Sequence, residues 1–361
     1  MDTPRGPLDG IRIIEFVGIG PAPFAAMQFA DLGADMVRIT RPGAVPLVPD
    51  PITGRGRPTI EVDLKDPDEI ARIAELVAHA DALLEGFRPG VMERLGLGPE
   101  PLLARNPKLV YGRMTGWGQT GPLASVAGHD INYIAITGAL AAIGPAERPV
   151  PPLNLVGDFG GGAMFLVSGM LAALISAGRT GVGQVVDAAM CDGAVSLMTM
   201  FHEMAASGDW IIEREANLID GGAPFYRTYE CADGAFIAVG AIEPQFYAKL
   251  AEAIGLTPDE AMLRMEKKNW PTLIARIGEI LRTRPAAEWV TLMEKTDACV
   301  SPVLSLADAP AHPHLAARGA FVEVDGKRQP APVPRFSATP TEARPKPAGV
   351  LTLGDALARW A

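Results

Sequence analysis

Two titratable side chains of this sequence stand in or beside glycine-rich turns. His129 lies in residues 128–133, Gly-His-Asp-Ile-Asn-Tyr, and Asp158 lies in residues 155–162, Leu-Val-Gly-Asp-Phe-Gly-Gly-Gly. A neutral imidazole takes up a proton near pH 7, and a carboxyl group can donate or accept one, so these residue types can work as a general acid and base. We therefore predict that His129 and Asp158 transfer protons as a pair.

Both residues also have a purely structural interpretation. His129 could cap the loop that enters a helix, and Asp158 could be the N-cap of the apolar helix that follows, a role worth about 1 kcal/mol. Residues 160–162 favour the functional interpretation of Asp158, because glycines leave the N–H groups at a helix start open to an anionic oxygen. Glu243 precedes a helix beginning at Pro244 and either caps that helix or aligns His129.

The elements that must position these residues alternate between two hydrophobic periods. The pattern predicts a strand at 11–17, a loop at 18–23, a helix at 24–32 and a strand at 35–40. It continues with a helix at 70–80, strands at 82–87, 109–113 and 183–189, and a buried apolar helix from 163 onward. Such alternation is typical of an α/β fold, a parallel sheet covered by helices.

The pattern changes after residue 190. Residues 191–222 are predicted to be helical and Met-rich and to form a linker that ends at a Gly-Gly-Ala-Pro break. Two strands around a turn within 226–239 then open a second compact unit, with helices at 245–254, 270–281 and 286–295. From residue 302 to 347 prolines are frequent, and we expect no packed element of its own in this tail.

Charge and composition exclude several classes of function. A formal net charge of −10 argues against general nucleic-acid binding, because affinity for a phosphate backbone needs an excess of Lys and Arg. The N-terminal residues lack the basic and apolar regions of a secretory signal, and the apolar stretch 163–177 is shorter than the roughly 20 residues that span a bilayer. We therefore expect a cytoplasmic protein with no membrane segment.

Common cofactor sites are not indicated either. The cysteines lie far apart and match no metal-ligand spacing, so we predict no metal. The loop 18–23 is similar to a dinucleotide-binding fingerprint but carries Pro23 in place of its third glycine. The next strand contains Arg38 where a nicotinamide site would want an acid, so the chemistry there suits a phosphate instead.

A series of short segments, in order along the chain, resembles the class III CoA-transferase superfamily, and most of all its racemase branch. The segments are residues 18–23, 34–39, 62–65, 85–90, 116–119, 128–133, 157–162, 220–226, 243–247 and 297–303. The resemblance therefore covers essentially the whole chain.

This resemblance implies a two-domain subunit. A Rossmann-like large domain would span 1–190 and be completed by 330–361, while 191–224 and 312–329 would link it to a smaller α/β domain at 225–311. Two subunits would form a homodimer of interlocked rings. Glu243 of one subunit would then meet His129 of the other.

By the same resemblance, coenzyme A is part of the substrate, and no separate cofactor is implied. The residues implied to hold CoA are Arg38, Val62, Asp63, Leu64, Lys65, Gly86, Phe87, Arg88 and Arg94, and those lining its thioester end are Gly128, Asp130, Ile131, Asn132 and Tyr133. The cations gathered in the first hundred residues agree with a phosphate site. They are Arg38, Arg55, Arg57, Lys65, Arg88 and Arg94.

The implied reaction is inversion at C2 of a branched 2-methylacyl-CoA. One group removes the α-proton, N–H groups beside Asp158 stabilise the enolate, and the other group returns a proton to the opposite face. Two alternatives stay open. One is CoA transfer with Asp158 as the nucleophile, and the other is an acyl-CoA binding protein without catalysis.

Overall fold

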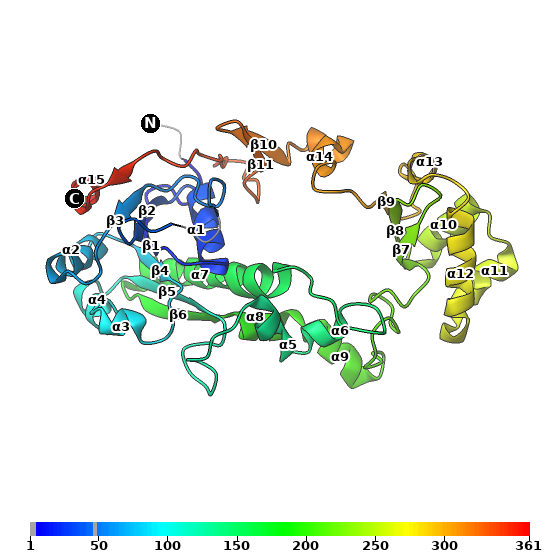
Figure 1. The fold of residues 1–361 in the computed structure, drawn as a ribbon, viewed down its shortest axis with the longest axis horizontal. Coiled ribbons are helices and arrows are strands. Elements are labelled where there is room, and N and C mark those ends of the chain that lie inside the picture. The colour runs from blue at the N-terminus through cyan, green and yellow to red at the C-terminus, as the bar shows by residue number, and fades with distance from the viewer. Residues whose placement is uncertain (1–4, 46–48) are drawn as a thin grey trace. The chain divides into compact units, whose positions relative to one another are not determined.

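The computed structural model describes residues 5–45 and 49–361, and the chain divides into two compact units (Figure 1). The first unit comprises Met1–Thr137, Leu153–Met198 and Pro313–Ala361, and the second comprises Gly138–Pro152 and Thr199–His312. Each unit is discontinuous in sequence. Segments far apart along the chain therefore pack together in both.

A parallel sheet forms the centre of the first unit, which confirms the predicted α/β fold. Its seven strands in the described residues lie in the order β12-β3-β2-β1-β4-β5-β6, and all neighbours are parallel. The order from β3 to β6 is that of the Rossmann fold. The strands are β1 (Arg12–Phe16), β2 (Asp35–Thr40), β3 (Thr59–Glu61), β4 (Ala82–Glu85), β5 (Val110–Thr115), β6 (Gln184–Ala189) and β12 (Val350–Leu351).

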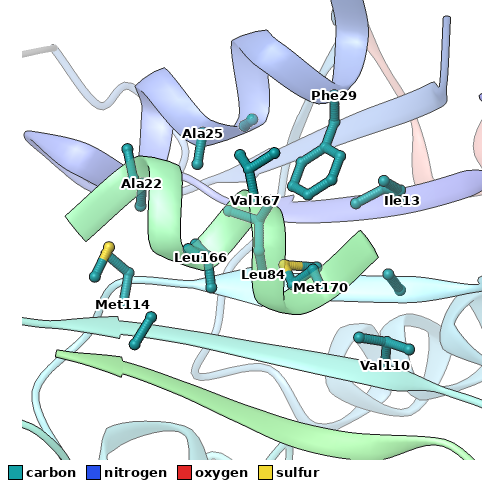
Figure 2. Packing of buried hydrophobic residues seen from close by; sticks show 14 of the residues in the cluster. Ile13, Ala22, Ala25, Phe29, Leu84, Val110, Met114, Leu166, Val167 and Met170 are labelled. Carbon is teal, nitrogen blue, oxygen red and sulfur yellow. The ribbon is translucent and has the colours of Figure 1, made fainter. Parts of the chain in front are cut away.

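Helices cover both faces of this sheet because its strands are apolar on both sides. Alternate residues of a strand point to opposite faces, so Ile13 joins one core cluster and Ile14 the other. On the first face, α1 (Pro21–Asp31) and α7 (Met164–Thr180) pack on the sheet and on each other, as Figure 2 shows. The second face carries α2 (Pro67–Val77), α3 (Val91–Arg94), α4 (Pro99–Arg105) and α15 (Leu353–Trp360).

The long apolar helix has an N-terminal extension that the sequence does not predict. α7 begins at Met164, which confirms the predicted helix from 163 onward, but an unpredicted π-helix, η1 (Leu155–Ala163), precedes α7 and runs directly into it. The continuous helix Leu155–Thr180 has 26 residues and a mean hydropathy of 1.8, and 39% of its most apolar window is buried. By length and composition alone it could cross a membrane. In the first unit its inner side packs on the sheet through Leu166 and Met170.

Glycines inside η1 allow close contact with a helix that the sequence assigns to a linker. A Cβ on Gly193 of α8 (Met190–Leu197) would lie 1.8 Å from the Gly161 carbonyl oxygen, and one on Gly161 would lie 2.8 Å from the Ala194 nitrogen. This tight packing places residues 191–198 in the first unit, in contrast to the predicted linker 191–224. The following helix, α9 (Thr199–Ser207), belongs to the second unit.

The second unit contains a small antiparallel sheet covered by helices. Its strands are β7 (Tyr226–Glu230), β8 (Phe236–Gly240) and β9 (Val300–Pro302), in that order across the sheet. The predicted hairpin and the three predicted helices are confirmed. The helices and short 3₁₀ segments are α10 (Pro244–Ile254), α11 (Pro258–Met262), η2 (Leu263–Met265), η3 (Lys267–Asn269), α12 (Trp270–Leu281), α13 (Ala286–Met293) and η4 (Ala309–Ala311).

A loop from the middle of the chain joins this second unit. Residues 138–152, which include α6 (Ala139–Ala142), were predicted to be part of the large domain. Arg214 instead connects the loop to the second unit by donating hydrogen bonds to the carbonyl oxygens of Ala141, Pro145 and Ala146, each at 3.0 Å.

The proline-rich tail is more structured than expected. It contains α14 (Pro313–Ala317) and an antiparallel hairpin of β10 (Phe321–Val324) and β11 (Lys327–Pro330), so the prediction that it has no element of its own is wrong. Arg55 donates to the Gln329 side chain at 2.7 Å, and Arg344 donates to the Ala30 carbonyl at 2.8 Å. Hydrogen bonds from the buried Arg55 and from the half-buried Arg344 thus hold the tail in the first unit.

Candidate active site

The strand order defines where a ligand is expected to bind. From β1 the chain crosses to β2 on one side, whereas β4 lies on the other side of β1. Ligands of such sheets bind outside the C-terminal ends of the strands at this switch point. The loops that follow β1 and β4 approach each other there, since a Cβ on Gly18 would lie 3.9 Å from the Gly86 carbonyl oxygen.

Asp158 lies against the loop that follows β1. A Cβ on Gly20 would lie 3.1 Å from Asp158 Oδ2, and Gly20 has a φ of +67°, so a larger residue would be unfavourable there on both counts. Asn154 donates a hydrogen bond from Nδ2 to the same carboxylate oxygen at 3.1 Å. The half-buried Asp158 is therefore held at the predicted ligand edge of the sheet.

His129 lies in the same unit and close enough for its charge to act on Asp158. It occupies the N-cap position of α5 (Asp130–Ala135), as the structural interpretation expected, but its side chain is exposed. Its backbone N–H donates to Asn132 Oδ1 at 3.0 Å, so Asn132 fixes the backbone at the start of α5. The fold thus brings together the two residues of the predicted acid–base pair.

The surroundings of Asp158 favour its protonated form. Burial raises the pKa of Asp158 above its ordinary value of 3.8, and the negative charge of Asp130 raises that pKa further. The hydrogen bond from Asn154 and the charge of His129 lower it, but they do not outweigh the burial. A carboxyl group with a raised pKa is suited to hold a proton and release it to a substrate.

Two details of the glycine-rich segment correct the expected enolate site. Asp158 is inside the first turn of η1 and is not an N-cap, and its own N–H already donates to Asp130 Oδ1 at 2.7 Å. Residues 160–162 lie further inside η1, where N–H groups bond to carbonyls five residues earlier, as Phe159 does to Asn154 at 3.2 Å. These amides are therefore not the open N–H groups that the sequence predicts for an anionic oxygen.

Tyr133 is a buried residue within electrostatic range of Asp158. Its ring packs closely against Gly116, where a Cβ would be 2.0 Å from the ring, and it meets Trp117 edge-on at 4.7 Å between ring centroids. Its hydroxyl donates to the Gly128 carbonyl. Burial raises the pKa of Tyr133, the charge of Asp158 raises it further, and the charge of Arg88 lowers it. Arg88 of the predicted CoA segment therefore lies within electrostatic range of Tyr133, the last residue of the predicted thioester segment 128–133.

Three of the six cations expected near phosphate are buried in ion pairs. Arg38 contacts Glu15 at 3.2 Å and Asp50 at 2.8 Å, and the fully buried Arg57 contacts Glu15 at 3.1 Å. Arg55 pairs with Asp31, also in the interior. Burial lowers the pKa of Arg57 to about 10. No pattern in the sequence distinguishes these paired guanidinium groups from exposed ones.

The other predicted CoA residues divide into buried and exposed positions. Val62 belongs to the core, and Phe87 packs edge-on against Phe16 at 6.2 Å. Lys65, Arg88 and Arg94 are exposed, as are Asp63, Ile131 and Asn132, while Leu64, Gly86 and Gly128 are half-buried. The exposed cations of the predicted CoA set are thus Lys65, Arg88 and Arg94, whereas Arg38 stays a predicted contact whose guanidinium is held by two carboxylates.

Glu243 lies in the second unit at the N-cap position of α10. Its side chain is exposed, and its charge raises the pKa of Cys299, whose thiol pKa is raised first by burial. The meeting of Glu243 with His129 across two subunits stays a prediction.

Sequence reasoning missed two members of the site, Asn154 and Gly20. Asn154 stands four residues before Asp158, a spacing that would have suggested one helix face had η1 been predicted. Gly20 was noted only as part of an incomplete dinucleotide motif. Among the described residues no group of three or more His, Cys, Asp or Glu side chains could hold a metal ion.

Comparison with known proteins places the chain in a family. The family model described as CoA-transferase family III matches residues 8–350, so the chain belongs to that family. The alpha-methylacyl-CoA racemase of Mus musculus is 44% identical over 336 residues, covering 92% of this chain and 87% of the mouse protein. The human protein of the same name is 44% identical over 330 residues, covering 90% and 86%.

A solved structure has the same fold. The crystal structure of Rv3272 from M. tuberculosis matches with a TM-score of 0.81 and 28% sequence identity, and the match covers 96% of this chain and 98% of that one. The predicted family resemblance is therefore confirmed by sequence and by fold.

Proposed function

We propose that this chain is a racemase of 2-methylacyl-CoA thioesters. The observation that carries the proposal is that Asp158 lies at the ligand edge of a Rossmann-like sheet, within electrostatic range of His129. The relatives named alpha-methylacyl-CoA racemase, at 44% identity over most of the chain, support the same substrate class.

The pair can carry out inversion without a separate cofactor. One group accepts the proton from C2, and the electrons of the broken C–H bond move into the thioester as an enolate. The other group then donates its proton to the opposite face of C2, and a new C–H bond restores the thioester. The raised pKa of Asp158 allows it to hold the proton that it donates in one direction and to take one up in the other.

The CoA part of the substrate fits the charges of the first unit. Lys65, Arg88 and Arg94 are exposed in the first unit and can contact phosphates. We further propose a homodimer in which Glu243 of the partner subunit aligns His129, and a cytoplasmic location. Coenzyme A is then part of the substrate and not a resident cofactor.

Incubation of each 2-methylacyl-CoA enantiomer in heavy water tests the proposal. We expect deuterium at C2 together with convergence of the two optical rotations. His129→Ala should abolish exchange from one enantiomer, and Asp158→Asn from the other. Deuterium uptake at full rate in His129→Ala would contradict the proton-transfer pair.

The same experiment separates the two alternatives. CoA transfer requires an acyl-Asp158 anhydride, which hydroxylamine would trap as a hydroxamate. A binding protein would take up the thioester with no exchange and no adduct. Either result would replace the racemase assignment.

A further inference from the structure

Asp130 has an unusual environment beside the proposed acid. It is only 9% exposed, and its Oδ1 accepts the N–H of Asp158 at 2.7 Å. Its Oδ2 is also buried and has no hydrogen-bond partner within the described residues. A buried oxygen without a partner destabilises a protein, so such a carboxylate is better explained by a role other than stability.

The position of Asp130 connects the two proposed catalytic residues. Asp130 directly follows His129 at the start of α5 and bonds to Asp158 in the first turn of η1. The two helices can approach this closely because residue 157 is glycine, where a Cβ would lie 2.4 Å from Asp130 Oδ1. One hydrogen bond therefore joins the segment that carries the base to the segment that carries the acid.

We propose that Asp130 is a positioning residue that fixes the spacing between His129 and Asp158 through its hydrogen bond to the Asp158 amide. The proposal rests on the proposed function, because the spacing matters only if both groups exchange protons with one carbon. A displacement of about 1 Å at a reacting group can lower a rate about 100-fold.

Asp130 also contributes a charge. The groups that act on Asp158 are Asn154, Asp130 and His129, and Tyr133 lies close enough to sense the charge of Asp158. The charges of Arg88 and Cys191 also act on the pKa of Tyr133, Arg88 lowering it and Cys191 raising it. Of these, Asp130 is the anion that Asp158 meets, and it raises the pKa of Asp158. At low pH, Asp158 becomes protonated and can no longer abstract a proton, which gives the pH–rate profile an acid limb. Removal of the Asp130 charge should move this acid limb to lower pH.

Two variants separate the hydrogen bond from the charge. Asp130→Ala removes both, and we expect kcat to fall about 100-fold with KM within about twofold of the wild type. Asp130→Asn keeps an acceptor for the Asp158 amide, so kcat should recover most of this loss while the acid limb moves to lower pH. Asp233→Asn is the matched control, because Asp233 also accepts a backbone N–H, that of Ala286, but in the second unit.

Hydrogen–deuterium exchange of the Asp158 amide gives a readout that does not depend on activity. This amide should exchange at least about 10-fold faster in Asp130→Ala and near the wild-type rate in Asp130→Asn and Asp233→Asn. Wild-type kcat and wild-type exchange in Asp130→Ala would overturn the proposal. If Asp130→Ala does not fold, an unchanged acid limb in Asp130→Asn would overturn it.

Failure of the proposed function looks different. A wild-type protein that exchanges no α-proton would reject the racemase assignment, and the amide exchange would still show whether Asp130 holds Asp158. A reduced kcat in Asp130→Ala together with unchanged amide exchange would reject the positioning role and leave the racemase assignment intact.

Discussion

Glu15 lies in β1 and Asp158 lies against the loop that follows β1, yet their carboxylates have opposite surroundings. Glu15 is fully buried between two guanidinium groups, those of Arg38 and Arg57. Asp158 is half-buried beside a second carboxylate, Asp130, and one amide donor, Asn154. The first environment compensates charge, and the second leaves it partly uncompensated.

The difference distinguishes a structural charge from a functional one. Breaking a buried pair costs stability because the remaining ion has no partner. A carboxylate beside another carboxylate gains no such stability, but its pKa moves towards values useful for proton transfer. Loss of Asp158 should therefore affect the reaction, and loss of Arg57 should affect the fold.

The largest expected effect is on catalysis. Asp158→Asn should lower kcat about 1000-fold, since general acid–base groups contribute about 10²- to 10⁴-fold. The measurement is racemisation of the 2-methylacyl-CoA thioester at saturation, together with α-proton exchange in heavy water from the enantiomer that Asp158 deprotonates. Asp233→Asn, a carboxylate of the second unit, should keep wild-type kcat. Retention of more than about a tenth of the wild-type rate in Asp158→Asn would show that the two regions do not differ as described.

The next effect is on stability. Arg57→Met leaves Glu15 with Arg38 as its remaining partner and should lower the free energy of unfolding by about 3–5 kcal/mol. Denaturant titration measures it. The double variant Glu15→Gln/Arg57→Met should recover part of the loss, because no carboxylate is then left uncompensated. A loss below about 1 kcal/mol in the single variant would contradict a structural role for the pair.

The two regions should also differ in the sign of their pH dependence. Burial opposes ionisation of Asp50, but the hydrogen bond from Lys346 and the charge of Arg38 outweigh it and lower the pKa of Asp50. Stability from Asp50 is therefore present above its unfolded pKa and is lost as pH falls through the folded one. For Asp158, whose pKa is raised, ionisation disfavours the folded state, so its cost appears as pH rises through the folded pKa.

Denaturant titration between about pH 3 and 7 checks these signs in two variants. Asp50→Asn should be less stable than the wild type at pH 7, with the difference shrinking in acid. Asp158→Asn should be at least as stable as the wild type at pH 7, and its advantage should shrink in acid. If both variants were less stable than the wild type at pH 7, or both more stable, the two regions would not differ in their pH dependence.

The smallest effect is expected for a pair outside both regions. Lys268 and Glu266 form an ion pair at 2.5 Å, but their side chains are 77% and 58% exposed. Lys268→Ala should change the free energy of unfolding by less than about 0.5 kcal/mol and leave kcat unchanged. A larger loss would mean that distance, and not burial, decides what an ion pair contributes here.

The sequence predicted the sheet well because its strands are apolar on both faces. Residues 35–40 were predicted to be a strand and form β2 with those bounds. The charges inside these strands were harder to interpret. Glu15 and Arg38 occupy neighbouring positions in β1 and β2, so each is the cross-strand partner of the other. A single charged residue within an apolar strand is the signal that could have revealed such a pair.

The sequence predicted which residue types form the candidate site, but it did not predict the backbone conformation that holds them. His129 and Asp158 were identified from their segments, but the π-helix was not, because glycines at 160–162 suggest a turn and the hydrogen bonds of a π-helix leave no 3.6-residue pattern. The hydrogen bond between Asp130 and the Asp158 amide joins residues 28 apart. No local pattern reports a contact over that separation.

The return of the chain to the first unit has a consequence for biosynthesis. β12 pairs with β3 at the edge of the sheet, and Trp360 of α15 is fully buried on the second face. These residues leave the ribosome only after the whole of the second unit has been made. During translation, the second unit can therefore fold while the edge of β3 is still uncovered, and an uncovered strand edge can pair with another chain until β12 is made.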